Sequence, residues 1–249
     1  MRVLITGASS GIGRDMAREF AKRKYELVLV ARNEEKLKEL QKELDVKTEI
    51  IIADLSIEEN CKKVYEQARD IDILVNNAGL GVFGDFTLTN LDKELNLIKT
   101  NIVAVHILTK LYLQDMCKKN SGKILNVGSI AGCMPGPLMA AYYSSKSYVV
   151  KLSESLREEL KKKKSAVKIS VLMPGPVRTN FDNVADVKFQ VHSLSSEYVA
   201  KYTVDKFLKN KFYIVPGVLM KIARFFAKIT PNFIVAKVTY HMQKKKKAR

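Results

Sequence analysis

The sequence predicts a single α/β domain with a doubly wound, seven-stranded parallel sheet and helices on both faces. Seven short segments are rich in Val, Ile and Leu with little alternation, as in strands covered on both faces. Segments with helical spacing of apolar residues lie between them, and this alternation favours a parallel sheet. Glycine-rich and polar motifs follow directly after several strands, at the edge where such sheets bind ligands.

The 249-residue chain is long enough, and at 47% hydrophobic residues apolar enough, to bury a substantial core. We expect residues 1–217 to form the domain and 218–249 to form a basic amphipathic C-terminal extension. The expected strands are residues 2–6, 26–31, 48–53, 72–76, 123–129, 167–172 and 212–215. The expected helices lie near residues 11–23, 34–44, 57–69, 100–119, 142–163 and 196–209.

The first strand runs directly into a glycine-rich turn, Gly7-Ala8-Ser9-Ser10-Gly11-Ile12-Gly13, which a helix follows. A strand, a glycine turn and a helix together direct backbone N–H groups and the positive end of a helix at a phosphate. Each glycine permits a close backbone approach or a conformation that a Cβ forbids. The spacing G-x-x-x-G-x-G differs from the G-x-G-x-x-G of the standard dinucleotide fingerprint. This segment predicts a phosphate site.

Tyr142 and Lys146 are the most informative pair in the chain, and Ser129 lies thirteen residues before the tyrosine. Four residues form about one helical turn, so the phenol and the ammonium project from the same face. A nearby cation favours the phenolate, so we expect Lys146 to lower the pKa of Tyr142 and make it a general acid or base. The same spacing occurs at Tyr202/Lys206 and Tyr240/Lys244. Neither of those tyrosines has a hydroxyl residue thirteen positions upstream.

These motifs together resemble the short-chain dehydrogenase/reductase family of the classical type. The resemblance covers about residues 1–217, with five motifs in the order of the family. They are Thr6-Gly7-x3-Gly11-x-Gly13, Asn76-Asn77-Ala78-Gly79, Ser129, Tyr142-x3-Lys146 and Pro174-Gly175. It implies a Rossmann-type domain and hydride transfer between a nicotinamide and a carbonyl or secondary alcohol. It also implies a homodimer or homotetramer.

The end of the second strand distinguishes NADP(H) from NAD(H). An acidic residue there binds the ribose hydroxyls of NAD. Arg32 occupies this place, and a guanidinium can form a fork of hydrogen bonds to a 2′-phosphate, with further contacts from Ser9 and Arg14. We therefore expect NADP(H) rather than NAD(H). The alternatives are that Arg32 only begins the surface of the next helix and that Asp54, which the resemblance places at the adenine, is a helix N-cap.

The resemblance assigns the catalytic roles. Tyr142 exchanges the proton, and Lys146 assists it and binds the nicotinamide ribose. Ser129 holds the substrate oxygen. Asn101 anchors a water next to the lysine, or alternatively is a polar group inside a helix that bonds to backbone. The expected cofactor-binding residues are Gly7, Ser9, Ser10, Gly11, Ile12, Gly13, Arg32, Asp54, Leu55, Asn77, Ala78, Gly79, Tyr142, Lys146, Pro174, Gly175, Val177 and Thr179.

The substrate pocket is expected to be apolar. Its predicted residues are Ser129, Tyr142, Gly81, Phe83, Cys133 and Phe181, with a flap over residues 180–195. This lining favours a fatty acyl, steroid or aromatic ketone. Cys133 has the alternative of being an inert buried thiol. The three cysteines are widely spaced, which favours a reducing compartment, and neither they nor the three histidines form a metal-binding pattern.

The C-terminal extension carries most of the charge. Thirteen Lys or Arg and one acidic residue, Asp205, lie between residues 201 and 249, so this part contributes +12 (13 − 1) of the net +17. Within 218–229 the apolar residues share one helical stripe, and Pro231 ends the pattern. A peripheral contact with an anionic membrane is one interpretation. Packing on the protein itself or on a second subunit is the other, while a nucleic-acid site is not indicated because no basic groove contains interleaved aromatics.

We therefore expect an NADP(H)-dependent oxidoreductase. The alternative is a non-catalytic NADP(H)-binding sensor or scaffold, against which the complete set of Ser129, Tyr142 and Lys146 argues. No signal-peptide pattern precedes the first strand, and no apolar run is long enough to span a bilayer as one helix. The expected location is the cytoplasm, with the membrane surface as the alternative.

Overall fold

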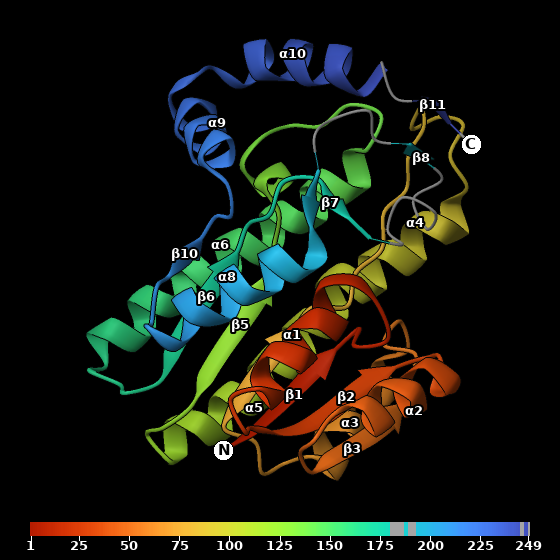
Figure 1. Cartoon of the computed structure of the whole chain (residues 1–249). Helices are drawn as coiled ribbons and strands as arrows, with labels where there is room; N and C mark the ends of the chain where they lie inside the picture. Colours follow the sequence, from red (N-terminus) through yellow and green to blue (C-terminus); the bar gives the residue numbers. More distant parts are fainter. Residues whose placement is uncertain (180–186, 189–192, 245–246, 249) are drawn as a thin grey trace.

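A computed structural model describes residues 1–179, 187–188, 193–244 and 247–248 (Figure 1). Its centre is a seven-stranded sheet in the order β10-β6-β5-β4-β1-β2-β3, in which every pair is parallel. β1 pairs with β2 on one side and with β4 on the other, so the strand order reverses there. Ligands bind at such a reversal in open α/β sheets. The predicted parallel sheet with helices on both faces is confirmed.

The sheet strands lie within two residues of their predicted bounds. They are β1 (Arg2–Thr6), β2 (Glu26–Ala31), β3 (Thr48–Ile52), β4 (Ile73–Asn76), β5 (Lys123–Val127), β6 (Lys168–Leu172) and β10 (Tyr213–Ile214). The helices are α1 (Gly11–Ala21), α2 (Glu34–Glu43), α3 (Glu58–Gln67), α4 (Leu91–Ile98), α5 (Val105–Lys118), α6 (Ala140–Lys162), α8 (Ser196–Leu208), α9 (Val218–Ile229) and α10 (Asn232–Lys244). Two short pairs lie outside the sheet, β7 (Val177–Arg178) with β9 (Leu194–Ser195) and β8 (Val187–Lys188) with β11 (Lys247–Ala248).

Both faces of the sheet are buried, which explains the continuous apolar runs of the strands. Alternate residues of β1 enter different cores: Val3 and Ile5 pack with α1, α2 and α8, whereas Leu4 packs with α3, α5 and α6. Tyr112 and Phe20 are the largest fully buried side chains of the two cores. Burial on both faces is typical of parallel sheets and holds the strand ends in fixed register.

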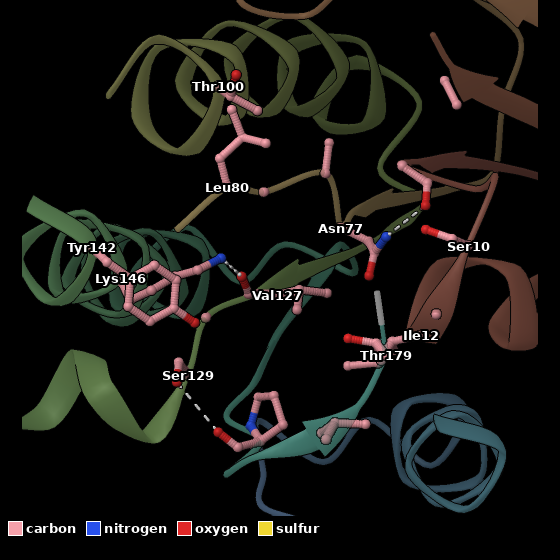
Figure 2. A pocket seen from close by; sticks show the side chains of 18 of the residues that line it. Ser10, Ile12, Asn77, Leu80, Thr100, Val127, Ser129, Tyr142, Lys146 and Thr179 are labelled. Atoms are coloured by element: carbon pink, nitrogen blue, oxygen red, sulfur yellow. Dashed lines mark hydrogen bonds between the residues drawn. The ribbon is translucent and has the colours of Figure 1, made fainter. Parts of the chain in front are cut away.

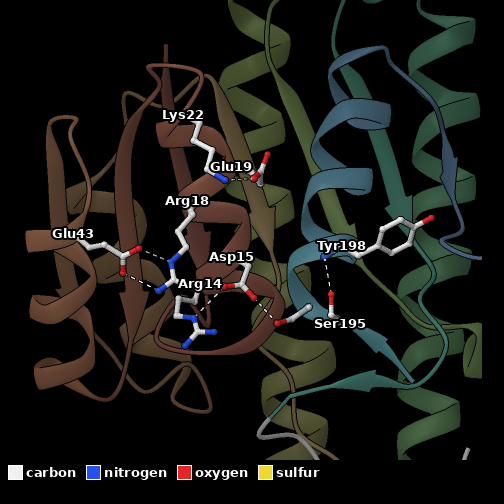
Figure 3. Close-up of polar contacts among 9 residues, drawn as sticks. Arg14, Asp15, Arg18, Glu19, Lys22, Glu43, Ser195 and Tyr198 are labelled. Carbon is white, nitrogen blue, oxygen red and sulfur yellow. Dashed lines mark hydrogen bonds and ion pairs between the residues drawn. The ribbon is translucent and has the colours of Figure 1, made fainter. Parts of the chain in front are cut away.

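Ionic contacts fix helix α1, which begins at the glycine turn (Figure 3). The buried carboxylate of Asp15 accepts hydrogen bonds from Arg18 Nη1 at 2.8 Å and from the hydroxyl of Ser196 on α8. The guanidinium of Arg18 also forks onto Glu43 of α2, with distances of 2.7 and 2.8 Å. Fork geometry is the stronger type of ion pair. These contacts join α1 to α2 and α8, so the N-terminus of α1 keeps its place at the sheet edge.

Two helices, α4 and α10, were not predicted from the sequence. The predicted helix 100–119 is preceded by α4, and a π-helical turn, Lys99–Ala104, joins α4 to α5. Leu91 and Leu95 of α4 are exposed, so their pattern does not mark a buried face. The local signal was Asn90, whose side chain caps the helix by accepting from Lys93 N at 3.0 Å.

Candidate active site

The glycine turn and the N-terminus of α1 form one end of a pocket of about 450 Å³. Gly7 and Gly11 adopt φ values of +64° and +54°, the left-handed region that favours glycine. A Cβ on Gly7 would lie 2.8 Å from Ala78 Cα. Ser10 precedes α1 without a side-chain cap, and the first turn of the helix has no acidic residue. Its positive end therefore faces the pocket and fits an anionic phosphate.

Asn77 holds the glycine turn through hydrogen bonds of its side chain. Its Nδ2 donates to Thr6 O at 2.9 Å and to Gly7 O at 3.2 Å. The hydroxyl oxygen of Thr6 accepts in return from Asn77 N at 2.9 Å and Ala78 N at 3.0 Å. A Cβ on Gly13 would lie 2.3 Å from Asn77 Nδ2, so this glycine permits the contact. The Thr6–Gly7 and Asn77–Ala78 segments, about seventy residues apart in the sequence, are thus joined by hydrogen bonds at this end of the pocket.

Ser129, Tyr142 and Lys146 converge on one wall of the same pocket (Figure 2). Ser129 follows the end of β5, and Tyr142 and Lys146 lie one turn apart on α6. Figure 2 shows the Tyr142 hydroxyl directed toward Ser129, with Lys146 beside the ring. Lys146 Nζ lies 5.9 Å from the centre of that ring and donates to Val127 O at 2.9 Å. Ser129 Oγ donates to Pro174 O at 3.3 Å and accepts from Ala131 N at 3.1 Å.

Burial controls the pKa values of both titratable groups, which differs from the expectation. Burial raises the pKa of Tyr142 to about 12, although its hydrogen bond with Ser129 acts in the lowering direction. Burial lowers the pKa of Lys146 to about 8. The prediction that Lys146 lowers the tyrosine pKa is therefore wrong for this arrangement, because burial raises that pKa and Lys146 is not among the groups that shift it. Tyr142 is consequently a protonated phenol at neutral pH.

Arg32 and Asp54 face the pocket from the ends of β2 and β3. The Arg32 side chain is 60% exposed, and Nη1 lies 3.8 Å from Asp54 Oδ2. Burial alone would raise the pKa of Asp54, but hydrogen bonds from Ser56 and the charge of Arg32 hold that pKa below its ordinary value. Asp54 does not cap helix α3, whose N-cap is Ile57. Arg14 pairs with Asp15 at 3.1 Å and is not part of the pocket lining.

Asn101 is fully buried in the π-helical turn and holds the Leu80 segment. Its Oδ1 accepts from Leu80 N at 2.8 Å, and its Nδ2 donates to Leu80 O at 2.9 Å and to Ser145 Oγ at 3.0 Å. The bonds to the Leu80 backbone are those expected if Asn101 is a buried polar group that bonds to backbone. π-Helical turns are frequent at functional sites, and this one aims an amide at the loop beside Lys146.

Residues 1–188 match the sequence model of the short chain dehydrogenase family. The chain belongs to the short-chain dehydrogenase/reductase family. It is therefore an oxidoreductase of a family that binds NAD(P) and acts on CH–OH and C=O groups.

Two curated relatives and one solved structure illustrate the similarity. The chain is 36% identical over 192 residues to the NADP-dependent 3-hydroxy acid dehydrogenase of Schizosaccharomyces pombe, covering 73% of each protein. It is 33% identical over 200 residues to the very-long-chain 3-oxoacyl-CoA reductase of Anas platyrhynchos, covering 75% of this chain but only 62% of that protein. The structure of a short-chain dehydrogenase from Sphingobium yanoikuyae in complex with NADPH superposes with a TM-score of 0.81 at 30% identity, covering 87% and 88% of the two chains.

Most of the site residues expected from the sequence line the same pocket. Eighteen line the pocket: Gly7, Ser9, Ser10, Gly11, Ile12, Arg32, Asp54, Leu55, Asn77, Ala78, Gly79, Ser129, Tyr142, Lys146, Pro174, Gly175, Val177 and Thr179. Among the described residues, Gly13, Asn101, Gly81, Phe83 and Cys133 are not part of that lining. Cys133 instead packs against a core, where burial raises its thiol pKa. Phe181 and most of the expected flap lie outside the described residues.

Sequence reasoning did not assign several further lining residues, of which Lys36, Met139 and Tyr143 are the most informative. Lys36 lies four residues after Arg32, and this spacing was a usable signal for a second cation at the same end of the pocket. Met139 precedes α6 and Tyr143 follows Tyr142, so both add apolar or aromatic surface next to the catalytic wall. The Tyr143 hydroxyl accepts from Gln243 Nε2 of α10 at 2.6 Å, a partner that only the tertiary fold reveals.

Proposed function

We propose that this protein is an NADP(H)-dependent oxidoreductase that reduces the carbonyl of an apolar substrate, or oxidises the corresponding secondary alcohol. The observation that carries the proposal is the convergence of Ser129, Tyr142 and Lys146 on a pocket that continues to the glycine turn. A cofactor that extends from the turn would reach those three side chains. The relatives named above are a dehydrogenase and a reductase, so the alternative of a non-catalytic sensor receives no support.

The chain's own groups suit carbonyl reduction. NADP(H), when bound, supplies the hydride. The Ser129 hydroxyl lies at the catalytic wall and could orient a carbonyl oxygen by turning its single proton from Pro174 O to the substrate. Tyr142, whose pKa burial raises to about 12, keeps the proton that the developing alkoxide requires. Lys146, 5.9 Å from the ring centre, can stabilise the negative charge that appears on the phenol oxygen as the proton leaves.

Two cations support NADP(H) over NAD(H). Arg32 and Lys36 both line the pocket where the second strand ends, and Arg32 retains an exposed guanidinium. A planar guanidinium binds phosphate through two parallel hydrogen bonds, and an ammonium adds a second charge. The S. pombe relative is named as NADP-dependent, which agrees with this preference.

The Arg32→Asp variant is expected to lower the ratio of kcat/KM with NADPH to kcat/KM with NADH by about 10- to 100-fold, because hydrogen bonds to a charged group contribute about 1.5–3 kcal/mol. An aspartate would also repel the 2′-phosphate and accept from ribose hydroxyls. Initial rates with each cofactor measure the ratio. Lys38→Asp is the matched control, since Lys38 lies on α2 outside the pocket lining and pairs with Glu34. An unchanged ratio in the Arg32 variant would contradict the assignment.

We propose a fatty acyl or related 3-oxo compound as the substrate class. Leu80, Met139 and Val177 give the pocket apolar surface beside the catalytic wall. The two curated relatives are named for 3-hydroxy acid and 3-oxoacyl-CoA substrates, which favours this class over steroids and aromatic ketones.

A panel of 3-oxoacyl thioesters, steroid ketones and aryl ketones, each with NADPH, tests the proposed activity. We expect the most rapid NADPH consumption with the 3-oxoacyl compounds. The Ser129→Ala variant should lower kcat/KM by about 10²-fold, because it removes one donor to the reacting oxygen. Absence of turnover with every carbonyl, or equal turnover by the variant, would refute the proposal.

We also propose a homodimer or homotetramer assembled through α5 and α6, in the cytoplasm. A groove between these helices is lined by Leu113, Leu152 and Leu156, which agrees with an apolar subunit contact. The three cysteines are free, as expected in a reducing compartment.

A further inference from the structure

Helix α9 lies on the protein with its apolar side outward. The residues on its inner side are only half-buried, and they are Met220, Ala223, Arg224 and Ala227. The exposed residues include every large aliphatic or phenylalanine side chain of the helix, namely Val218, Leu219, Ile222, Phe225, Phe226 and Ile229. A surface helix of a globular protein normally turns its apolar stripe to the core. The orientation of α9 is the reverse.

Cations and small side chains hold the inner side of α9 in place. The Arg224 guanidinium lies 3.6 Å from the ring centre of Tyr213, and Lys228 Nζ lies 5.6 Å from the same ring. Lys221 Nζ lies 5.9 Å from the ring centre of Tyr202. Cation–π contacts of this kind orient a helix without burying apolar area. The contacts with Tyr202 and Tyr213 therefore fix the orientation in which the apolar side of α9 faces outward.

Helix α10 also exposes most of its large apolar side chains. Its buried residues are Val235, Thr239 and Gln243, and two of the three are polar. The Thr239 hydroxyl donates to Pro135 O at 2.9 Å, and Gln243 Nε2 donates to the Tyr143 hydroxyl at 2.6 Å. Its exposed side carries Phe233, Ile234, Val238, Tyr240 and Met242, together with Lys237, His241 and Lys244. Figure 1 shows α9 and α10 consecutive at one end of the molecule, away from β3 and α3.

We call the exposed apolar residues of the two helices, named above, the α9–α10 face. A contiguous apolar surface with a polar rim marks an interaction site. The two helices are basic, since five Lys or Arg and no Asp or Glu lie within α9 and α10. No helix among the described residues is both long and apolar enough to cross a bilayer.

We propose that the α9–α10 face docks on an anionic lipid bilayer, with both helices lying in the plane of the membrane surface. Amphipathic helices bind in this way, with the apolar side at the acyl boundary and cations at the level of the headgroups. Each basic residue near an anionic surface adds about 1 kcal/mol of attraction. The cation–π contacts of α9 keep its basic side toward the protein and the rim, as this orientation requires.

A second copy of the chain fits this surface less well. A symmetric contact would place the same surface on both subunits. The five cations of α9 and α10 would then lie near the same five of the other subunit, with no acidic residue in either helix to pair with them. Opposed like charges are costly at a desolvated interface. Lipid phosphates supply the missing negative charge.

Docking would bring the substrate end of the pocket close to the lipid. Met220 of α9 packs against the pocket residue Gly175, where an added Cβ would lie 2.4 Å from its Sδ. Gln243 of α10 bonds the pocket residue Tyr143. An apolar carbonyl could then pass from the bilayer to Tyr142, a consequence that rests on the proposed function. The docking itself does not depend on it.

Vesicle flotation of the full chain tests the docking. The chain should float with vesicles of phosphatidylcholine and phosphatidylglycerol, much less with phosphatidylcholine alone, and less as salt increases. The double variant Leu219→Ser/Phe226→Ser should bind about tenfold or more weakly, because it removes two side chains from the lipid contact. These residues are 67% and 55% exposed, so the fold does not require them. Ile52→Ser/Ile57→Ser is the matched control, with exposures of 51% and 53% at the opposite end of the molecule, and should bind as the unmodified chain does.

Two results would overturn the proposal. One is flotation of the unmodified chain no greater than that of the α9 variant. The other is a change in sedimentation from a larger to a smaller species in the α9 variant with vesicle binding unchanged, which would assign the face to a second copy. The α9 variant should also keep its rate with a short, water-soluble ketone. If the unmodified chain has no activity with this ketone, that result counts against the proposed function and does not affect the flotation result.

Discussion

Replacing Tyr142 with phenylalanine is expected to lower kcat/KM for carbonyl reduction by about 10³-fold, within the range for loss of a general acid. The substitution removes the hydroxyl that faces Ser129 and leaves the ring in its place on α6. Binding of NADPH should persist, because the glycine turn and Arg32 lie at the other end of the pocket. Initial rates of NADPH consumption and a fluorescence titration with NADPH measure the two effects separately.

Tyr143→Phe is the matched control for this experiment. Tyr143 is the adjacent residue and also lines the pocket, but its hydroxyl accepts from Gln243 of α10. Loss of that bond should change kcat/KM by only a few-fold, since no proton reaches the substrate from it. Equal losses in the two variants would remove Tyr142 from the role of proton donor.

The sheet and its motifs were predictable because their signals are local. Val3, Leu4 and Ile5 are apolar on both faces, and the glycines that follow need a backbone without Cβ, as the positive φ values of Gly7 and Gly11 confirm. The spacing of Tyr142 and Lys146 fixes one helix face in any helix. Once the strand order reverses between β1 and β4, the residues after each strand end meet at one edge.

The features that the sequence did not predict depend on tertiary packing. Two of the three leucines of helix α4, Leu91 and Leu95, are exposed and only Leu97 is buried, so its apolar spacing is a weak signal. The short helix that ends at Cys133 contacts α6 and α9, and Cys133 packs against a core there. Its separation of four residues from Ser129 in the sequence does not predict this packing. The pKa of Tyr142 follows from burial, whereas charge spacing alone predicted the opposite direction. The outward apolar side of α9 follows from the positions of Tyr202 and Tyr213, which no helical wheel contains.

The Lys146→Met variant is expected to be more stable and much less active at pH 7. Burial lowers the pKa of Lys146 from its ordinary value of 10.5 to about 8, so the folded protein holds this proton less tightly than the unfolded chain. Below pH 8 the lysine is charged in both states, and its burial reduces the free energy of unfolding by on the order of 3 kcal/mol. Between pH 8 and 10.5 the unfolded chain binds more protons, so this penalty shrinks as pH rises and is absent above 10.5.

Methionine removes the penalty but leaves Val127 O without the 2.9 Å bond from Nζ, at a cost of about 1 kcal/mol. The net gain of about 2 kcal/mol should raise Tm by about 4–8 °C at pH 7, and it should become a loss of about 1 kcal/mol at pH 10.5, where only the lost bond remains. The kcat/KM should fall by about 10²-fold or more, because no cation remains to stabilise the phenolate. Thermal unfolding at the two pH values and initial rates provide the measurements, with the exposed Lys151→Met on the same helix as the control. A variant that is less stable at pH 7 than the unmodified chain would show that the buried ammonium is held by more than Val127 O, and that its charge stabilises the fold as well as serving the reaction.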